Sequence, residues 1–149
     1  EPTFGMERIF LAILTKAYCE DKERGNIILR IPAKLAPIKA AVFPIIKSEE
    51  FEKNSEKIVR DLKKEFNVVY DKSGSIGRRY ARNDEAGTPF CITIDEDSLK
   101  KDDVTIRIRD TTEQVRIKIN VLKDSIRRAI DGENILKFGK IIDTRKKIS

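Results

Sequence analysis

The sequence contains no histidine and only two cysteines in 149 residues. Histidine is the commonest general base and metal ligand in proteins, so its absence removes every Ser-His and Cys-His nucleophile arrangement. Cys19 and Cys91 lie far apart and form no Cys-x-x-Cys pair, so their spacing gives no support to a zinc site. We therefore expect no catalysis by this chain alone, no bound metal, and two reduced, buried thiols.

Long apolar runs are also missing. No stretch approaches the roughly 20 apolar residues that a membrane-spanning helix needs, and the N-terminus lacks the pattern of a signal peptide. These absences predict a chain that has no membrane contact and works in the cytoplasm.

Charge, by contrast, is abundant and unevenly placed. Charged residues make up 38% of the chain and apolar residues 40%, with a net charge of +6. Residues 121–149 hold eight basic and four acidic side chains, so much of the excess lies at the C-terminal end. A positive surface attracts polyanions, although many proteins with lysine-rich surfaces carry a similar charge.

The length fits one compact domain with a short appendage. Phe10, Ile13, Leu14 and Ala17 recur at helical spacing and predict a helix in a region that ends at Gly25. Two prolines bracket a linker after it, and we place a domain boundary near residue 35. The expected units are residues 1–34 and 35–149.

The second unit reads as an α/β domain. Residues 38–46 are apolar on both strand faces, residues 51–66 form an amphipathic helix, and residues 68–70 form another strand, which together predict a right-handed βαβ unit. Ser75 and Gly87 bound a short basic helix. Further along, the expected elements are a strand over 89–94, a hairpin over 104–119 with one polar face, and a last helix over 120–130.

The polar face of the hairpin is one candidate site. If the hairpin closes across residues 110–113, Arg107 faces Arg116 and Arg109 faces Gln114. Like charges opposite one another destabilise a hairpin, so such a cluster suits phosphate groups or base edges. In the alternative, each arginine stem covers apolar surface and its head lies in water.

The basic helix is a second candidate site. Residues 74–77 lead into its N-terminus, where free N–H groups favour an anion, although no Gly-Lys-Ser/Thr ending follows. Tyr80 could stack on an unpaired base; in the alternative it packs inward, and the neighbouring arginines pair with Asp84 and Glu85. The basic residues around the tyrosine are Arg78, Arg79 and Arg82.

Three ordered segments resemble the anticodon-binding domain of glycyl-tRNA synthetase, in its archaeal and eukaryotic-like form. They are residues 75–87 (SIGRRYARNDEAG), 89–95 (PFCITID) and 109–116 (RDTTEQVR). Residues 1–9 (EPTFGMERI) resemble motif 3 of the same class II enzyme. The resemblance covers nearly the whole chain and is weakest over residues 132–149.

The resemblance implies a mixed five-stranded sheet flanked by helices, preceded by a helical remnant of the catalytic domain. It makes Arg8 the motif 3 arginine that contacts ATP phosphates, and it places Glu1 and Thr3 where the family recognises glycine, although serine is usual at the position of Thr3. Motifs 1 and 2 are absent from this sequence. The resemblance therefore implies a homodimeric full enzyme that uses ATP and Mg²⁺, whereas this fragment is expected to be inactive alone and to hold no cofactor.

In the full enzyme, glycine is activated as an adenylate and transferred to tRNA-Gly, while this module holds the anticodon loop and contributes binding and positioning. A glycine anticodon is rich in cytosine, so Asp84, Glu85 or Glu113 would suit the cytosine amino group. The complete set of RNA-binding candidates is Arg78, Arg79, Tyr80, Arg82, Asp84, Glu85, Arg107, Arg109, Glu113, Gln114 and Arg116.

Three alternatives stay open. A DNA polymerase accessory subunit resembles these synthetases, but the intact Gly5-x-Glu7-Arg8 argues against a lost active site. The synthetases for threonine, proline and histidine share the domain class, but residues 77–85 (GRRYARNDE) fit glycine better. A purely structural or dimerising module would be excluded by tight tRNA binding with a steep salt dependence.

Overall fold

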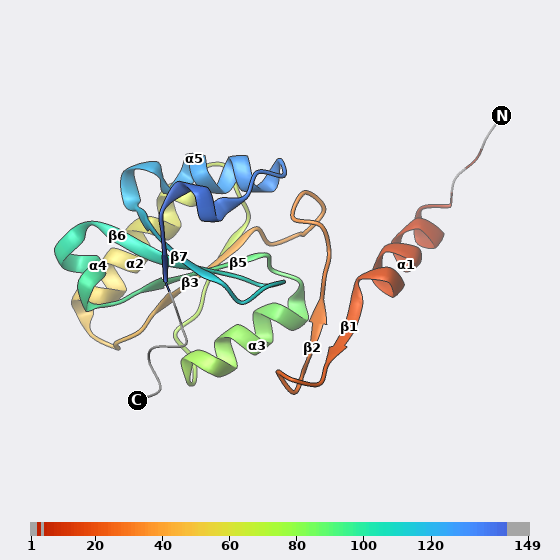
Figure 1. The fold of residues 1–149 in the computed structure, drawn as a ribbon, viewed down its shortest axis with the longest axis horizontal. Helices are drawn as coiled ribbons and strands as arrows, with labels where there is room; N and C mark the ends of the chain where they lie inside the picture. The colour runs from red at the N-terminus through yellow and green to blue at the C-terminus, as the bar shows by residue number, and fades with distance from the viewer. Residues whose placement is uncertain (1–2, 4, 143–149) are drawn as a thin grey trace.

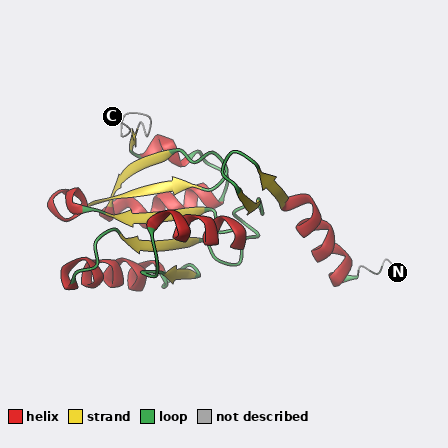
Figure 2. Cartoon of the chain, turned by 90° about the horizontal axis from the view of Figure 1, so that it is seen from below, coloured by secondary structure: helices red, strands yellow, loops and turns green. Residues whose placement is uncertain are grey.

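A two-stranded sheet and a larger mixed sheet organise the residues that the computed structural model describes, 3 and 5–142. The elements are α1 (Met6–Ala17), β1 (Tyr18–Asp21), β2 (Asn26–Leu29), β3 (Ala40–Pro44), α2 (Glu49–Leu62), β4 (Val68–Tyr70), α3 (Ile76–Ala86), β5 (Phe90–Ile94), α4 (Glu96–Lys101), β6 (Asp103–Ile108), β7 (Gln114–Lys118), α5 (Ile119–Ile130), the 3₁₀ helix η1 (Ile135–Phe138) and β8 (Lys140–Ile142). In both views, α1 lies at the far end of the β1–β2 hairpin from the α/β body (Figures 1 and 2). None of the described helices is long and apolar enough to cross a membrane.

The large sheet has the strand order β4-β3-β5-β6-β7-β8. β3 pairs in parallel with β4 and β5, and the remaining pairs are antiparallel. The predicted mixed sheet flanked by helices is confirmed, but it has six strands among the described residues and not five. The sixth is β8, in the tail whose structure the sequence left open.

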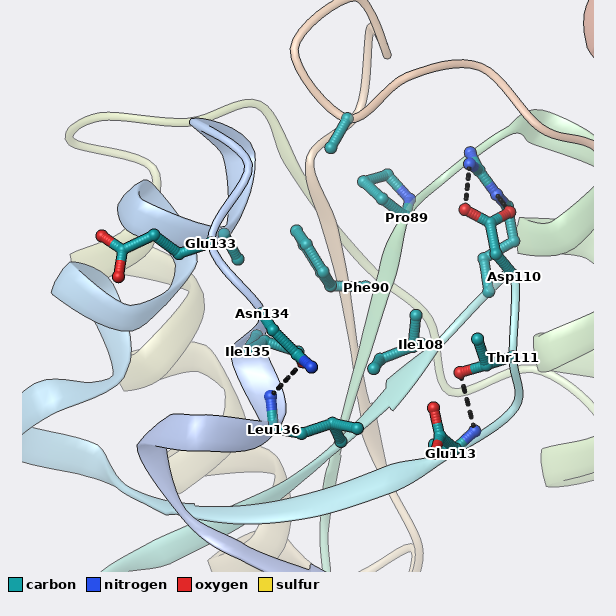
Figure 3. A pocket seen from close by; sticks show the side chains of 13 residues that line it. Pro89, Phe90, Ile108, Asp110, Thr111, Glu113, Glu133, Asn134, Ile135 and Leu136 are labelled. Carbon is teal, nitrogen blue, oxygen red and sulfur yellow. Dashed lines mark hydrogen bonds and ion pairs between the residues drawn. The ribbon is translucent and has the colours of Figure 1, made fainter.

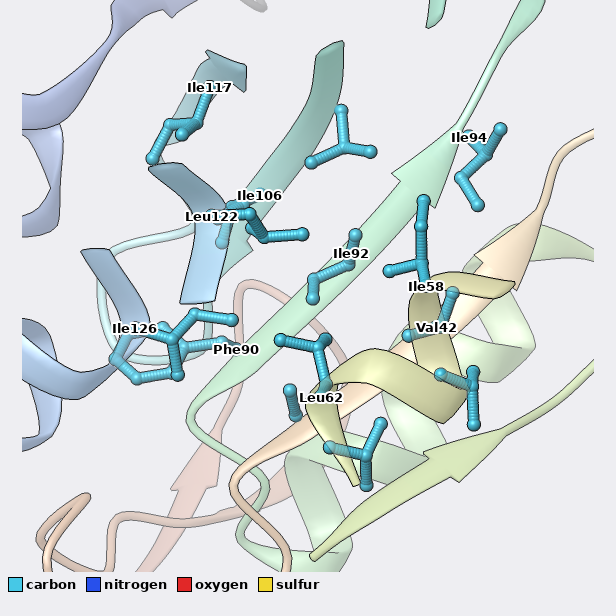
Figure 4. Close-up of a cluster of buried hydrophobic side chains, with 14 of the residues drawn as sticks. Val42, Ile58, Leu62, Phe90, Ile92, Ile94, Ile106, Ile117, Leu122 and Ile126 are labelled. Carbon is cyan, nitrogen blue, oxygen red and sulfur yellow. The ribbon is translucent and has the colours of Figure 1, made fainter. Parts of the chain in front are cut away.

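The main core lies between the sheet and the helices α2 and α5. Branched aliphatic side chains from the central strands meet Leu62 of α2 and Ile126 of α5 (Figure 4). Ile92 and Ile106 are fully buried there, and burying each such side chain stabilises the fold by about 1.5–3 kcal/mol. This layer makes the sheet a rigid platform for its opposite face.

The opposite face carries α3. Ile76 and Tyr80 of α3 pack on Ala41, Phe43 and Cys91 of the strands beneath. β6 and β7 continue this face with polar residues. Residues that are paired in the register point to the same side of the sheet, so the row can be followed from strand to strand. The polar row consists of Thr93, Thr105, Arg107, Gln114 and Arg116.

The N-terminal helix ends earlier than the sequence predicted. It stops at Ala17, and residues 18–29 form the β1–β2 hairpin. Gly25 has a positive φ of 68° and lies in the hairpin turn, so it is not the end of a helix. The helical spacing of apolar residues breaks down after Ala17, and a strand replaces the helix.

The β6–β7 register also differs from the prediction. Arg107 lies opposite Gln114, and Arg116 lies opposite Thr105, so Arg107 does not face Arg116 and Arg109 does not face Gln114. The hairpin closes one residue earlier than expected, since the N–H of Ile108 donates to the carbonyl of Glu113. Each residue of β6 therefore pairs with a β7 residue two positions earlier than predicted. A shift by an even number of residues keeps every side chain on its predicted face.

Candidate nucleic-acid interface

The structure places the predicted RNA-binding residues of α3 and of the β6–β7 strands on one side of the sheet. α3 packs on the face that contains Cys91, and Cys91 lies opposite Arg107 in the register. The two candidate segments, which the sequence analysis treated separately, thus share one side of the sheet, but their individual side chains differ sharply in exposure.

Arg107 and Asp84 form a buried ion pair. The two Nη atoms of Arg107 donate to the two carboxylate oxygens of Asp84 at 2.9 and 3.0 Å. Burial lowers the pKa of Arg107, but the hydrogen bonds and charge of Asp84 outweigh it and raise that pKa above its ordinary value. In this geometry the carboxylate of Asp84 is occupied and does not accept from a cytosine amino group.

Arg79 and Arg109 are both 2% exposed and donate mainly to backbone carbonyls. Arg79 donates to the carbonyl of Pro44 at 2.7 Å and to that of Gly74 at 2.9 Å. Arg109 donates to the carbonyl of Gly87 at 2.7 Å and also to the carboxylate of Asp110. The expected guanidinium cluster facing a ligand is therefore not formed, because these heads satisfy loop carbonyls that would otherwise lack donors.

Tyr80 packs inward. Its ring meets that of Phe43 edge to face at 5.7 Å, and the guanidinium of Arg107 lies 4.6 Å from the ring centre. Burial raises the pKa of Tyr80. Of the two readings that the sequence left open, the structure favours the packed tyrosine over one that stacks on a base.

Arg78 and Arg82 on α3 remain accessible. Arg82 donates to the carboxylate of Asp71 at 2.6 Å while its side chain stays 47% exposed. Burial raises the pKa of Asp71, but the hydrogen bonds from Arg82 and from the backbone of Ser73 outweigh burial and lower that pKa below its ordinary value. Arg78 is exposed and forms no ion pair with any residue in the described ranges.

Arg116 lies among acidic residues that the sequence analysis did not single out. It pairs with Asp95 and donates to Asp103 at 2.9 Å, with Asp97 at 4.0 Å. Asp95 also caps α4 through a reciprocal capping box with Ser98. The Asp-x-x-Ser spacing after a predicted strand was a signal that could have placed Asp95 at this site.

These groups lie where the parallel strands end. We call this surface the C-terminal edge and define it by Lys47, Lys72, Arg78, Arg82, Asp95 and Arg116. The chain leaves β3 toward β4 on one side and returns across β3 to β5 on the other, so the strand order reverses between β3 and β5. In open α/β sheets, ligands bind outside the carboxyl ends of the strands at such a point.

Glu85, Glu113 and Gln114 lie toward the opposite end of the sheet. Glu85 belongs to the last turn of α3, and Gln114 begins β7 after the β6–β7 turn. Glu113 is exposed and lines a cavity of about 360 Å³ between that turn and η1 (Figure 3). The structure thus does not bring these three residues together with Arg78.

The remaining predicted residues lie near the N-terminus. Arg8 and Thr3 are exposed, while Glu1 lies outside the described residues. Three cavities of the described part are lined by residues within 33–136, and Arg8 is not among their lining residues. No group of three or more potential metal ligands occurs among residues 3 and 5–142.

Three curated relatives are glycine–tRNA ligases. The one from Rhodopirellula baltica is 49% identical over 127 residues, covering 80% of this chain and 24% of the relative. Those from Caldanaerobacter subterraneus and Archaeoglobus fulgidus are 51% and 42% identical, covering 80% and 95% of this chain and 26% and 25% of the relatives. The chain therefore spans about a quarter of the length of these relatives.

A solved structure of prolyl-tRNA synthetase from Cryptosporidium parvum is similar with a TM-score of 0.65 and 25% identity, covering 69% of this chain and 22% of that one. A family model described as "Anticodon binding domain" matches residues 39–129. The matched range includes α3, the β6–β7 hairpin and the C-terminal edge. Since the match covers more than half of its residues, the chain belongs to the anticodon-binding domain family.

Proposed function

We propose that this chain is the anticodon-binding part of a glycine–tRNA ligase and binds tRNA-Gly. The observation that carries the proposal is the family match over the residues that form the C-terminal edge, where accessible guanidinium groups adjoin carboxylates. Glycine is favoured over proline because the glycine–tRNA ligases are 42–51% identical, against 25% for the prolyl-tRNA synthetase. The intact Gly5-x-Glu7-Arg8 argues against the DNA polymerase accessory subunit.

The cationic side chains at the edge have suitable partners in an RNA loop. Arg78, Arg82 and Lys72 are accessible cations for backbone phosphates, which position a nucleic acid without reading it. Arg116 offers donors for guanine, whereas both carboxylate oxygens of Asp95 already accept hydrogen bonds, from Ser98 and from Arg116. Glu85, Glu113 and Gln114 stay secondary candidates, since they lie at the other end of the sheet.

The remaining steps belong to the full enzyme, which would couple glycine to its tRNA with ATP and Mg²⁺. Arg8 is exposed and is not among the residues that line the cavities described above, and one guanidinium alone does not make an ATP site. We propose that Arg8 contacts ATP phosphates, and that Glu1 and Thr3 contact glycine, only when joined to a complete catalytic domain. We also propose units divided near residue 35, a homodimeric enzyme and a cytoplasmic location.

Titration of this chain with tRNA-Gly, and with the same tRNA carrying an altered anticodon, tests the proposal. We expect tighter binding of the native anticodon and at least threefold weaker binding for Arg78→Ala. Arg60→Ala is the matched control, because Arg60 is an exposed arginine of α2 on the opposite face. Equal affinity for both tRNAs would show that the chain does not read the anticodon. Equal losses of affinity in Arg78→Ala and Arg60→Ala would show that the C-terminal edge is not the interface.

A further inference from the structure

Two arginines attach the β1–β2 hairpin to the α/β body; we call Arg24 and Arg109 the arginine clamp. Arg24, in the hairpin turn, donates through Nη1 to the carbonyl of Arg109 at 2.6 Å and through Nη2 to that of Asp110 at 3.0 Å. In the other direction, Arg109 donates through Nη2 to the carbonyl of Ile31, just after β2, at 2.8 Å. The hairpin is therefore bound at both its turn and its end.

Charges around the clamp are balanced by carboxylates. Nε of Arg24 lies 3.2 Å from Asp21 of the same hairpin, and its Nη1 lies 3.6 Å from Asp84 of α3. Asp84 is 1% exposed and also holds Arg107. The clamp thus joins the hairpin directly to the ion pair beneath α3.

α3 and β2 approach each other closely at Gly87. This residue ends α3 with a φ of +79°, and an added Cβ would lie 3.2 Å from both the carbonyl oxygen of Leu29 and Cδ1 of Ile31. Backbone in contact with backbone leaves little room for the hairpin to tilt.

No linker separates the hairpin from α1. Ala17 ends α1 and Tyr18 begins β1, while the N–H of Arg30 donates to the carbonyl of Ala17 at 2.7 Å. Ala17 is buried against Ile31 and Ala36. α1 runs directly into β1 in Figure 1, so we expect the hairpin to set the direction of α1.

We infer that the arginine clamp holds α1, with Arg8 on it, at a fixed position relative to the C-terminal edge, so that Arg24 and Arg109 are positioning residues for transfer of glycine to tRNA. The inference rests on the proposed function. If one end of the tRNA is bound at the edge, the clamp determines where its other end meets the catalytic domain. Misplacement by about 1 Å can cost up to about a hundredfold in rate.

The test compares Arg24→Ala with Lys22→Ala in the full-length enzyme that contains this chain. Lys22 is an exposed lysine in the same turn, so its loss changes the charge equally. We expect Arg24→Ala to lower kcat for glycylation of tRNA-Gly by about tenfold or more, with little change in KM for tRNA. Lys22→Ala is expected to leave both constants within about twofold.

Two reactions that do not use the anticodon distinguish a loss of tRNA positioning from a general loss of enzyme activity in Arg24→Ala. Glycine-dependent exchange of pyrophosphate into ATP, and glycylation of an acceptor-stem minihelix, should stay within about twofold for Arg24→Ala. Equal losses with minihelix and tRNA, or no loss with tRNA, would overturn the inference. Failure of the unmodified chain to prefer tRNA-Gly in the titration above would instead overturn the proposed function.

A structural readout on this chain needs no activity. Hydrogen exchange of Arg24→Ala should accelerate at the amides of β1 and β2 and stay unchanged at β5 and β6. Arg24→Lys keeps the charge but cannot donate to two carbonyls in the fork geometry of arginine, so it should restore little of the protection. Full restoration by lysine, or equal acceleration across the large sheet, would contradict a geometric clamp.

Discussion

Buried arginines in this fold bind oxygen atoms of the protein itself. Arg79, Arg107 and Arg109 donate to carbonyls or to Asp84 from positions at most 7% exposed. A guanidinium has five donors in a planar fork, so one side chain can join several loops. Arginine-rich segments of such a domain therefore contribute to stability as well as to a basic surface.

The buried pair gives a stability prediction. Arg107→Ala leaves the carboxylate of Asp84 buried with only Arg24 nearby, at 3.6 Å, and breaking a buried pair in this way costs about 3–5 kcal/mol. Chemical denaturation should show this loss, while exposed Arg78→Ala changes the free energy of unfolding by about 0.5 kcal/mol or less. A loss below about 1 kcal/mol for Arg107→Ala would mean that the pair is not a major support.

Cys91 gives a pH prediction. Burial raises the pKa of its thiol from an ordinary value of 9.0 to about 12. Between these values the unfolded chain loses the proton first, so the contribution of the protonated thiol to stability is complete below pH 9.0 and is lost as pH rises, by up to about 1.4 kcal/mol per pH unit. Unfolding of the parent chain should therefore depend more steeply on pH above 9 than that of Cys91→Ala. Parallel curves would show that Cys91 stays accessible.

At the residue scale, the sequence predicted two candidate segments, but it predicted neither that they share one side of the sheet nor which of their side chains are available. Arg78 and Arg79 are adjacent and equally basic, yet Arg78 is exposed and Arg79 is 2% exposed. Helical rotation separates them, and the face that α3 buries depends on strands distant in sequence. Arg24 could not be recognised because its acceptors are carbonyls, which any residue type supplies.

At the scale of single elements, α3 was predicted with its observed bounds. Ser75 accepts a hydrogen bond from the N–H of Arg78, and Gly87 takes the left-handed conformation that ends the helix. Chemistry local to each end therefore determines this helix. β1 and β8 lacked such signals, because β1 follows α1 directly and β8 is a three-residue strand beside η1.

Gly139 controls whether β8 joins the sheet. A Cβ there would lie 2.1 Å from the carbonyl oxygen of Arg116 and 2.8 Å from Cγ1 of Ile117, so only glycine fits this approach to β7. Gly139→Ala should detach β8 and lower the melting temperature, with faster hydrogen exchange at Ile141 and Ile142. Gly132→Ala is the control, since an added Cβ there meets nothing within 4 Å although its φ of +108° brings backbone strain. Unchanged exchange in β8 for Gly139→Ala would show that the backbone shifts at low cost.

At the scale of the whole molecule, the net charge of +6 favours binding of a polyanion, and the salt dependence of tRNA binding reports how many phosphates are contacted. Each phosphate neutralised on a single strand contributes about −0.7 to the slope of log K against log salt. Arg78→Ala should reduce the magnitude of that slope by about 0.7 to about 1, measured by filter binding between about 50 and about 200 mM salt. Arg60→Ala should leave the slope unchanged; a change equal to that of Arg78→Ala would indicate diffuse attraction by net charge.

The architecture as a whole followed from patterns of period and alternation. Apolar residues 40–44 are buried on both faces, and the alternation in β6 and β7 gives one apolar and one polar face. These patterns predicted the βαβ unit, the hairpin and their flanking helices. The packing of the N-terminal hairpin on α3 was not predictable, because it depends on contacts between residues more than 50 positions apart.

The acceptors of the arginine clamp have a consequence for how related sequences diverge. Four of its bonds end on backbone oxygens, those of Ile31, Gly87, Arg109 and Asp110. Substitution at any of these four positions keeps a carbonyl in place, so these bonds do not constrain the side chains there, whereas Arg24 itself has no equivalent replacement. Across related sequences, Arg24 should be constant, and methods that detect contacts from paired substitutions should overlook its bonds to carbonyls and detect only its ion pairs with Asp21 and Asp84.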